Sequence, residues 1–264
     1  RQDSRDITKY IIGIGQGGTT LPDRDFYLKN DARSQKIRTE YTKYIATLFT
    51  LCGLENYKAL ANASTIMQLE TAIANAQMSR VEMRDPVKLY NKFSVDSLSA
   101  KTPNLNWQTI LTQLGYQTKQ DSLIVSNPKF MVFIDSLLAA TSLADWKVYL
   151  QWGVMKGAAP YLSKAFVDAN FAFNQVMSGQ KTQTPRWQRM SGLIDGQLGE
   201  LLGQLYVDKY FNQAAKTRML ELVNNLQETF DSRIKQLDWM SAETRQRALG
   251  KLHAFTKKIG FPDK

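Results

Sequence analysis

Apolar residues recur at helical spacing along almost the whole chain after residue 18, and this period limits the fold more than any other feature. The spacing predicts helices over residues 32–51, 57–80, 185–210, 214–237 and 241–258. The stripe of the first helix consists of Ile37, Tyr41, Tyr44, Ile45 and Leu48. The buried face expected in the helix over 214–237 consists of Met219, Val223, Leu226, Phe230 and Ile234.

Short signals mark where the helices begin and end. Gly53 stops the first helix, as glycine does after a C-terminus. Ser142 and Asp145 resemble a capping box that opens an apolar segment over 143–177. Glycines and a proline interrupt this segment, which is therefore either kinked or two helices in series. An N-cap followed by proline predicts two more helix starts, at Asp85-Pro86 and Asn127-Pro128.

The front of the chain differs, because residues 7–14 are rich in β-branched and aromatic residues and predict a strand. The strand runs into Gly13-Ile14-Gly15-Gln16-Gly17-Gly18, which matches the G-x-G-x-x-G pattern. A dinucleotide fold also needs a helix at the third glycine and a second strand, and neither is expected here. We therefore interpret the glycines as a turn, in a mainly α, multi-helix domain with one short strand near the N-terminus.

The net charge of +10 over 264 residues would suit a nucleic-acid-binding protein, but the distribution of the charges argues against that class. Lys and Arg alternate with Asp and Glu and form no basic block of five or more. Solvated helix faces account for them better. No apolar run approaches the roughly 20 residues that cross a bilayer.

One cysteine and one histidine limit the chemistry. Cys52 is expected to be a buried small hydrophobic residue, and a lone cysteine excludes an internal disulfide framework and a multi-cysteine zinc cluster. His253 is expected to be an ordinary helix residue, since H-E-x-x-H needs two histidines. We therefore predict no catalytic residue, no cofactor-binding residue and no metal ligand in this chain.

Five strings, in order along the chain, resemble the neprilysin family of zinc metalloendopeptidases, which includes the endothelin-converting enzymes and bacterial oligopeptidases. They are Leu21-Pro22-Asp23-Arg24-Asp25-Phe26-Tyr27-Leu28, Arg84-Asp85-Pro86 with Leu89-Tyr90-Asn91-Lys92, Arg186-Trp187 with Gly199 and Gln204-Leu205-Tyr206-Val207, Leu237-Asp238-Trp239-Met240-Ser241-Ala242-Glu243-Thr244-Arg245, and Ile259-Gly260-Phe261-Pro262-Asp263. Each string is weak alone, and most are packing or capping signatures, with Trp187 and Trp239 expected as core anchors. Five in the family's order indicate the family.

The resemblance implies that residues 1–264 are part of one mainly helical, lid-type domain of a larger peptidase. The family's zinc ligands and general base would lie beyond Lys264, so zinc is expected in the parent enzyme and not in this segment. The implied partners are the catalytic domain of the same protein and oligopeptide substrates, with no nucleic acid. The lid encloses the cavity and limits substrate size.

The resemblance also bears on origin. Vertebrate members place disulfide cysteines near positions 28 and 190, where this chain has Leu28 and Met190. That fits a bacterial member, exported by family habit. The alternative from another class is a stand-alone helical binding or scaffold domain without enzymatic activity. The sequence that follows Lys264 separates the two, because an H-E-x-x-H roughly a hundred residues on would indicate the peptidase.

The resemblance further implies that residues 7–14 form the second strand of a hairpin whose turn lies at Asp3–Asp6. Its first strand would precede Arg1, which would leave the second strand to find another partner or stay exposed as an edge. The helices are likewise expected to present an apolar or mixed face that normally meets the catalytic domain. We therefore expect the segment to be less stable alone and to self-associate.

We predict that the polypeptide of residues 1–264 binds no stoichiometric zinc and cleaves no peptide, because it lacks the ligand set. Metal analysis of the purified polypeptide and a peptidase assay check both points. One tightly held zinc per chain together with peptide cleavage would contradict this prediction.

Overall fold

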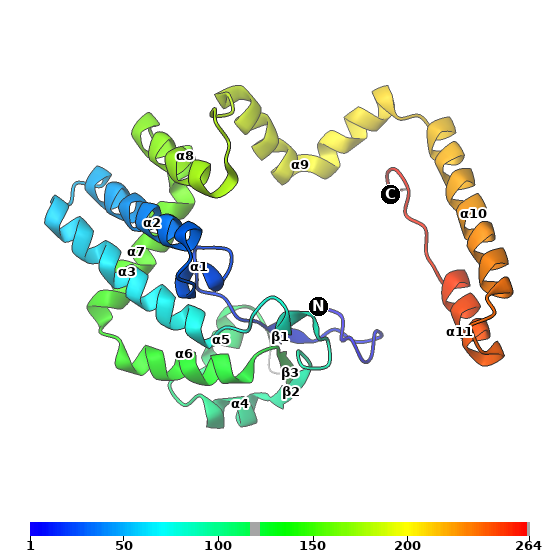
Figure 1. Cartoon of the computed structure of the whole chain (residues 1–264), viewed down its shortest axis with the longest axis horizontal. Helices are drawn as coiled ribbons and strands as arrows, with labels where there is room; N and C mark the ends of the chain where they lie inside the picture. Colours follow the sequence, from blue (N-terminus) through cyan, green and yellow to red (C-terminus); the bar gives the residue numbers. More distant parts are fainter. Residues whose placement is uncertain (117–121, 263–264) are drawn as a thin grey trace. The chain divides into compact units, whose positions relative to one another are not determined.

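The computed structural model describes residues 1–116 and 122–262, and the chain folds as two compact units. Unit 1 is Arg1–Gln183 and unit 2 is Thr184–Lys264. Helices account for well over half of the described residues, which confirms the mainly α fold class with strand structure near the N-terminus. The colours of Figure 1 follow the chain through both units.

Unit 1 contains eight α-helices among the described residues. They are α1 (Asp25–Leu28), α2 (Ala32–Leu51), α3 (Asn56–Ala76), α4 (Val95–Lys101), α5 (Trp107–Gln113), α6 (Pro128–Ala140), α7 (Leu143–Ala158) and α8 (Lys164–Ser178). Two 3-10 turns accompany them, η1 (Glu82–Arg84) and η2 (Ala159–Tyr161). The segment over 143–177 is thus two helices in series, one of the two expected arrangements.

The larger core of unit 1 lies between α2, α3, α7 and α8, with α2 and α3 side by side in Figure 1. The predicted stripe of α2 is buried in full. Four rings form its centre: Tyr44 stacks on Phe173 at 5.1 Å between centroids, and Trp152 meets Tyr41 edge-on at 5.8 Å. Helix α2 ends at Leu51, and Gly53, two residues further on, has a φ of +93° that favours glycine, as expected after a helix C-terminus.

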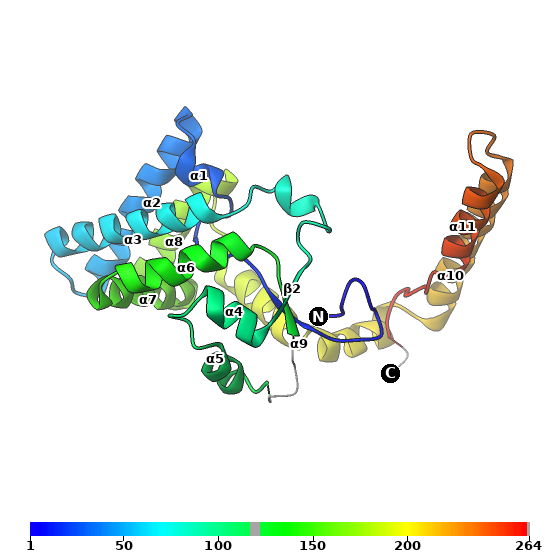
Figure 2. The same cartoon turned by 90° about the horizontal axis from the view of Figure 1, so that it is seen from below.

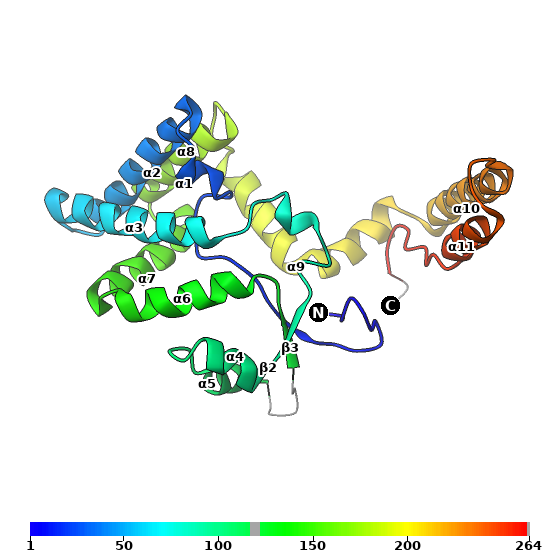
Figure 3. The same cartoon turned by 60° about the horizontal axis from the view of Figure 1, so that its bottom comes forward.

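A three-stranded sheet builds a second, smaller core. Strands β1 (Ile12–Ile14), β2 (Asn91–Ser94) and β3 (Ser122–Val125) are ordered β1-β3-β2, with β1 parallel and β2 antiparallel to β3. Figure 3 shows the strands beside α4 and α5. On the other side, α6 lies along α3 (Figure 2). Residues from β3, α3, α4, α5 and α6 close this core: Leu123, Val125, Ile73, Leu98, Trp107 and Phe130.

The expectation that no second strand follows the first was wrong, and length is the physical reason. Strands β2 and β3 have four residues each, too few to show a period of two. All three apolar residues of β3, Leu123 to Val125, are buried, so its two faces do not alternate. Only the pairing with β1 and β2, distant in sequence, specifies it as a strand.

The N-terminal hairpin is present, with residues 4–8 in its turn. The amide of Asp3 donates to the carbonyl of Lys9 at 2.9 Å, and that of Ile11 donates to Arg1 at 2.9 Å. Residues 1–3 thus pair with residues 9–11 around an isolated antiparallel bridge from Gln2 to Tyr10, and the expectation that the whole partner segment precedes Arg1 was wrong. The chain then continues into β1, which takes β3 as its partner and forms one edge of the sheet.

The cap signals divide into two that start helices and one that does not. Asn127 caps α6 through Phe130 N at 3.1 Å, and Ser142 caps α7 through Asp145 N at 3.1 Å. Asp85 accepts from the amides of Val87 and Lys88 but caps only a single turn. The expected helix after Asp85-Pro86 is absent because the chain enters β2 six residues after Asp85, where pairing with β3 determines its conformation.

Unit 2 has three α-helices among its described residues: α9 (Arg186–Tyr210), α10 (Gln213–Gln236) and α11 (Ala242–His253). Helix α9 is kinked at Leu198, where φ is −122° and ψ is 19°. The last helix was expected to reach residue 258 and ends at His253, so Lys257 and Lys258 lie in the segment that follows.

We predict that Asn127→Ala lowers the free energy of unfolding by about 2 kcal/mol, against about 1 kcal/mol for the exposed cap variant Ser142→Ala. Asn127 is buried, and its amide also donates to Gln16 Oε1 at 3.0 Å, whereas the second bond of Ser142, from its hydroxyl to Asp145 Oδ2 at 2.7 Å, is exposed to solvent. Urea unfolding followed by near-ultraviolet circular dichroism measures both. Equal losses would show that the second bond of Asn127 contributes nothing.

Candidate functional site

The glycine pattern after β1 forms a turn and an extended segment. No helix opens at its third glycine; the next one along the chain is α1, which starts at Asp25. Gly18 has a φ of +86°, and its carbonyl accepts from the Tyr149 hydroxyl at 2.5 Å. These contacts hold a chain segment against α7, and the arrangement lacks the helix N-terminus that a pyrophosphate needs.

Cys52 lies in unit 1 and His253 lies in unit 2, and their side chains have different partners. Cys52 is exposed, with Sγ 3.3 Å from Met155 Sδ, so its expected burial was wrong. It follows the last residue of α2, where the chain turns outward before Gly53. His253 is the last residue of α11, which confirms that it is a helix residue. Its Nε2 lies 2.7 Å from Asp231 Oδ2 on α10.

The donors for a metal ion are dispersed. Within residues 1–116 and 122–262, no group of three or more His, Cys, Asp or Glu side chains is arranged to hold an ion. The described residues thus do not fit a zinc ion. That the segment binds none stays a prediction.

Glu70 has a buried carboxyl group with several hydrogen-bond donors, and it lies on α3 with its side chain at 1% exposure. Its Oε1 accepts from Thr20 Oγ1 at 2.7 Å, and its Oε2 accepts from Tyr27 at 2.7 Å and Tyr41 at 2.8 Å. Each of these hydroxyls is itself an acceptor. The amide of Leu21 donates to Tyr27 OH at 2.8 Å.

The same network includes α7. Trp152 Nε1 lies 3.0 Å from Tyr41 OH and 3.2 Å from Thr20 Oγ1, and Lys156 Nζ donates to Thr20 Oγ1 at 3.1 Å. Burial raises the pKa of the Glu70 carboxyl above its ordinary value, while the hydroxyl donors and the charge of Lys156 oppose that shift. The network thus ties the segment of the first family string to α2, α3 and α7.

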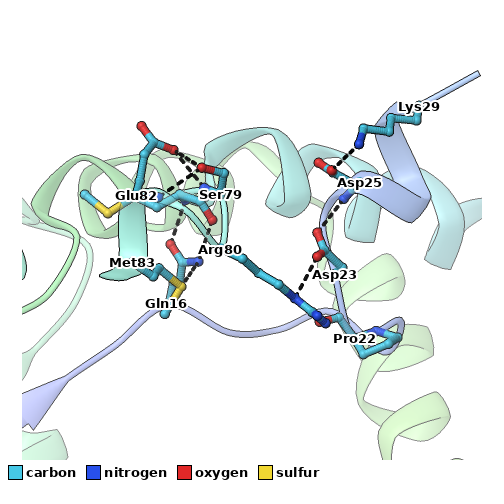
Figure 4. Close-up of polar contacts among 10 residues, drawn as sticks. Gln16, Pro22, Asp23, Asp25, Lys29, Ser79, Arg80, Glu82 and Met83 are labelled. Carbon is cyan, nitrogen blue, oxygen red and sulfur yellow. Dashed lines mark hydrogen bonds and ion pairs between the residues drawn. The ribbon is translucent and has the colours of Figure 1, made fainter. Parts of the chain in front are cut away.

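A second, outer layer of polar contacts continues from residues 16–25 to the chain just after α3 (Figure 4). The side-chain amide of Gln16 donates to the backbone carbonyl of Met78 at 3.0 Å, and the backbone amide of Met78 donates to Gln16 Oε1 at 2.7 Å. Arg80 reaches back to Asp23 at 2.7 Å and to the Pro22 carbonyl at 3.1 Å. The Arg24 guanidinium binds the Gln77 carbonyl.

The hydrogen bonds of these two layers join residues 16–25, α2, α3, α7 and the chain after α3, so they position these segments relative to one another. The string Leu21 to Leu28 therefore serves as a latch: Leu21 and Tyr27 enter the core, and Arg24 and Asp23 bind the chain after α3. That the chain carries no catalytic residue stays a prediction. Sequence reasoning missed Glu70. The available signal was a charged residue on the apolar stripe of α3, one turn from both Ile66 and Ile73.

In unit 2, residues of the third and fifth family strings line one cavity, and Phe261 of the fifth string also contacts residues that follow the third. Phe261 meets Phe211 edge-on at 6.0 Å, and its carbonyl accepts from Lys216 Nζ at 2.9 Å. Asp263 of the fifth string lies outside the described residues. Phe211 and Phe261 both line this cavity of about 750 Å³. Its other lining residues include Gly199, Gly203, Tyr206, Val207 and Pro262.

Several residues expected in a core of unit 2 are exposed. Trp187 and Trp239 are 71% and 72% exposed, so the expectation that they anchor a core was wrong. On the face of α10 expected to be buried, Leu226 and Phe230 are more than half exposed. The physical reason is that no other described element of unit 2 faces this side of α10, since α11 packs on a different side of the helix.

Comparison with known proteins identifies relatives across the chain. Residues 1–262 match the family model described as Peptidase family M13, in its N-terminal part. The chain is 29% identical over 99% of its length to an endothelin-converting enzyme homolog of Locusta migratoria and 30% identical to human endothelin-converting enzyme-like 1. It spans 37% and 34% of those relatives, about a third of their length.

Solved structures agree with the sequence relatives. The zinc metalloprotease Zmp1 of Mycobacterium tuberculosis in complex with an inhibitor matches all of this chain over 40% of its own, with a TM-score of 0.92 and 35% identity. PepO from Lactobacillus rhamnosis matches 96% of this chain over 40% of its own, with a TM-score of 0.82. At 18% identity, that second likeness shows the fold alone.

We predict that Glu70 makes the free energy of unfolding fall as pH rises. Its pKa is raised in the folded state above the ordinary value of 4.5, so the folded protein binds more protons than the unfolded chain between that value and the raised one. Stability therefore declines from about pH 4.5 through the raised pKa. We therefore expect the free energy of unfolding of the wild type, minus that of Glu70→Gln, to decrease with pH over this range. Above the raised pKa, this difference should stay constant.

Denaturant unfolding at a series of pH values measures this difference. Glu55→Gln is the matched control, because Lys58 holds the pKa of the exposed Glu55 below its ordinary value and no such fall arises there. Parallel pH profiles for the wild type and Glu70→Gln would show that the raised pKa is wrong.

Proposed function

The chain belongs to peptidase family M13, and we propose that it is the non-catalytic helical part of a zinc metalloendopeptidase that hydrolyses oligopeptides. The observation that carries this is the match of residues 1–262 to the N-terminal family model, in a chain that spans only about a third of its curated relatives. The rest of such a protein has room for a separate catalytic centre.

The zinc of this enzyme would be held outside residues 1–264. Zinc sites use Cys, His, Asp or Glu ligands that converge on one ion, and the described residues present no such group. Bound zinc would polarise the scissile carbonyl and activate water. The residues of this chain contribute no step to that chemistry. Their part is to shape the space around it.

We propose further that the helical region encloses the peptide-binding cavity, limits substrate size and faces the catalytic domain of the same protein. Unit 1 is suited to this role, because its two hydrophobic cores and the hydrogen-bond network of Glu70 hold its helices in one fixed arrangement. A rigid domain around the cavity can keep a folded protein out, whereas a flexible domain would move aside and admit it. Whether all of residues 1–264 form one lid-type domain stays a prediction.

An exported, bacterial origin is a proposal of the same kind. Leu28 and Met190 stand where vertebrate relatives are expected to carry bridging cysteines, and similar solved structures come from Mycobacterium tuberculosis and Lactobacillus rhamnosis. Within the described part of the chain, no helix combines the length and the apolar character needed to span a membrane.

We expect the full-length protein to cleave oligopeptides, to lose activity about ten-fold or more on treatment with a chelator and to regain it with zinc. A cleavable sequence should be cut as a free peptide and resist when it lies in a loop of a folded domain. Unfolding that domain is the matched control and should restore cleavage.

Equal cleavage of the folded domain and the free peptide would contradict the enclosing role and leave the zinc chemistry intact. Absence of any zinc-dependent cleavage would favour the stand-alone scaffold.

A further inference from the structure

Unit 2 lacks a core of its own. Among its described residues, Leu249 and Leu252 are the only buried apolar side chains, both on α11. Fifteen large apolar side chains of the same unit are exposed, in a segment of about eighty residues. Unit 1 contrasts with this, because its helices enclose two clusters of buried apolar residues. A soluble unit with this ratio of exposed to buried apolar side chains is incomplete.

The exposed apolar residues are ordered along the helices. On α9 they recur at positions 194, 198, 201 and 205, and on α10 at 219, 222, 226 and 230. Each series steps by three or four residues, so each forms one stripe on its helix. We define the α9–α10 apolar surface as Ile194, Leu198, Leu201, Leu205, Met219, Leu222, Leu226 and Phe230.

Helix α11 does not cover the stripe of α10. It packs through Gln227, whose side chain donates to the Leu252 carbonyl at 2.7 Å, and through Asp231, which binds His253 at 2.7 Å. Positions 227 and 231 lie about 100° around the helix from the stripe at 219, 226 and 230. The stripe therefore has no partner within the described residues of unit 2.

The length of chain outside the structure supplies an occupant. The relatives are about three times as long as this chain, and the similar Zmp1 chain is matched over only 40% of its length. We propose that the α9–α10 apolar surface is buried against the remaining part of the same polypeptide. Unit 2 then belongs to the core of the catalytic part, and the boundary between lid and catalytic part lies at Gln183–Thr184.

This inference rests on the proposed function, because the occupant is the remainder of the parent peptidase. It also separates two roles. Unit 1 would be the self-sufficient lid, and unit 2 would be the structural floor that the catalytic part completes. A second copy of this chain is the competing occupant, since two exposed stripes could cover each other.

Hydroxyl-radical footprinting of the full-length protein tests the proposal with matched leucines. Leu201 and Leu205 of unit 2 are 63% and 69% exposed in this structure, and Leu150 and Leu143 of unit 1 are 64% and 71% exposed. We expect Leu201 and Leu205 to react roughly five-fold more slowly than their unit 1 counterparts. The sample should be monomeric by sedimentation, so that protection comes from the same chain.

Equal reactivity within the pairs overturns the proposal, as does protection that appears only when the protein self-associates. A thermal melt adds a second readout: Leu201→Gln in the full-length protein should lower the Tm by several degrees more than Leu150→Gln. Equal shifts would also count against burial.

The two proposals fail separately. A protein that cleaves peptides with zinc but leaves Leu201 and Leu205 reactive refutes only the docking surface. A protein with these leucines protected but without zinc-dependent cleavage refutes only the proposed function.

Discussion

The fold of unit 1 depends on the buried carboxylate of Glu70. A charge at this depth is costly unless it is hydrogen-bonded, and three hydroxyls, from Thr20, Tyr27 and Tyr41, satisfy it. Hydrogen bonds to a charged group contribute about 1.5–3 kcal/mol each. The three donors come from the segment before α1, from α1 and from α2, so one side chain on α3 specifies where each must lie. Trp152 then extends the same arrangement to α7.

Unit 2 shows the opposite condition, in which helices form but enclose almost nothing. Local signals mark the start of two of its helices: Asn212 caps α10 through Ala215 N at 2.9 Å, and Ser241 caps α11 through Thr244 N at 3.2 Å. What is missing is the burial that gives most helices their stability. The proposed burial of the α9–α10 apolar surface accounts for the contrast: one chain would contain both a body with its own cores and a part that the rest of the polypeptide completes.

Sequence reasoning worked where the signal is local and periodic. It placed α2, the helical segment over 143–177, for which two helices in series was one of two expected arrangements, and the caps Asn127 and Ser142. It failed where partners distant in the chain decide the outcome. Strands β2 and β3 exist because they pair, Asp85 caps a turn because β2 follows, and Glu70 is buried because distant hydroxyls meet it. Trp187 was expected to anchor a core because most of the family strings are typical of packing or capping, and such a string cannot say whether the covering surface belongs to the same segment.

The central claim is that this chain is one part of a two-part peptidase, with unit 1 complete in itself and unit 2 completed by the remainder. Amide hydrogen exchange of the 264-residue chain and of the full-length protein compares the two units directly. We expect α2, α3 and α7 to exchange equally slowly in both, and α9 and α10 to exchange quickly in the chain alone and slowly in the full-length protein. Equal protection of α9 and α10 in both proteins would contradict the account.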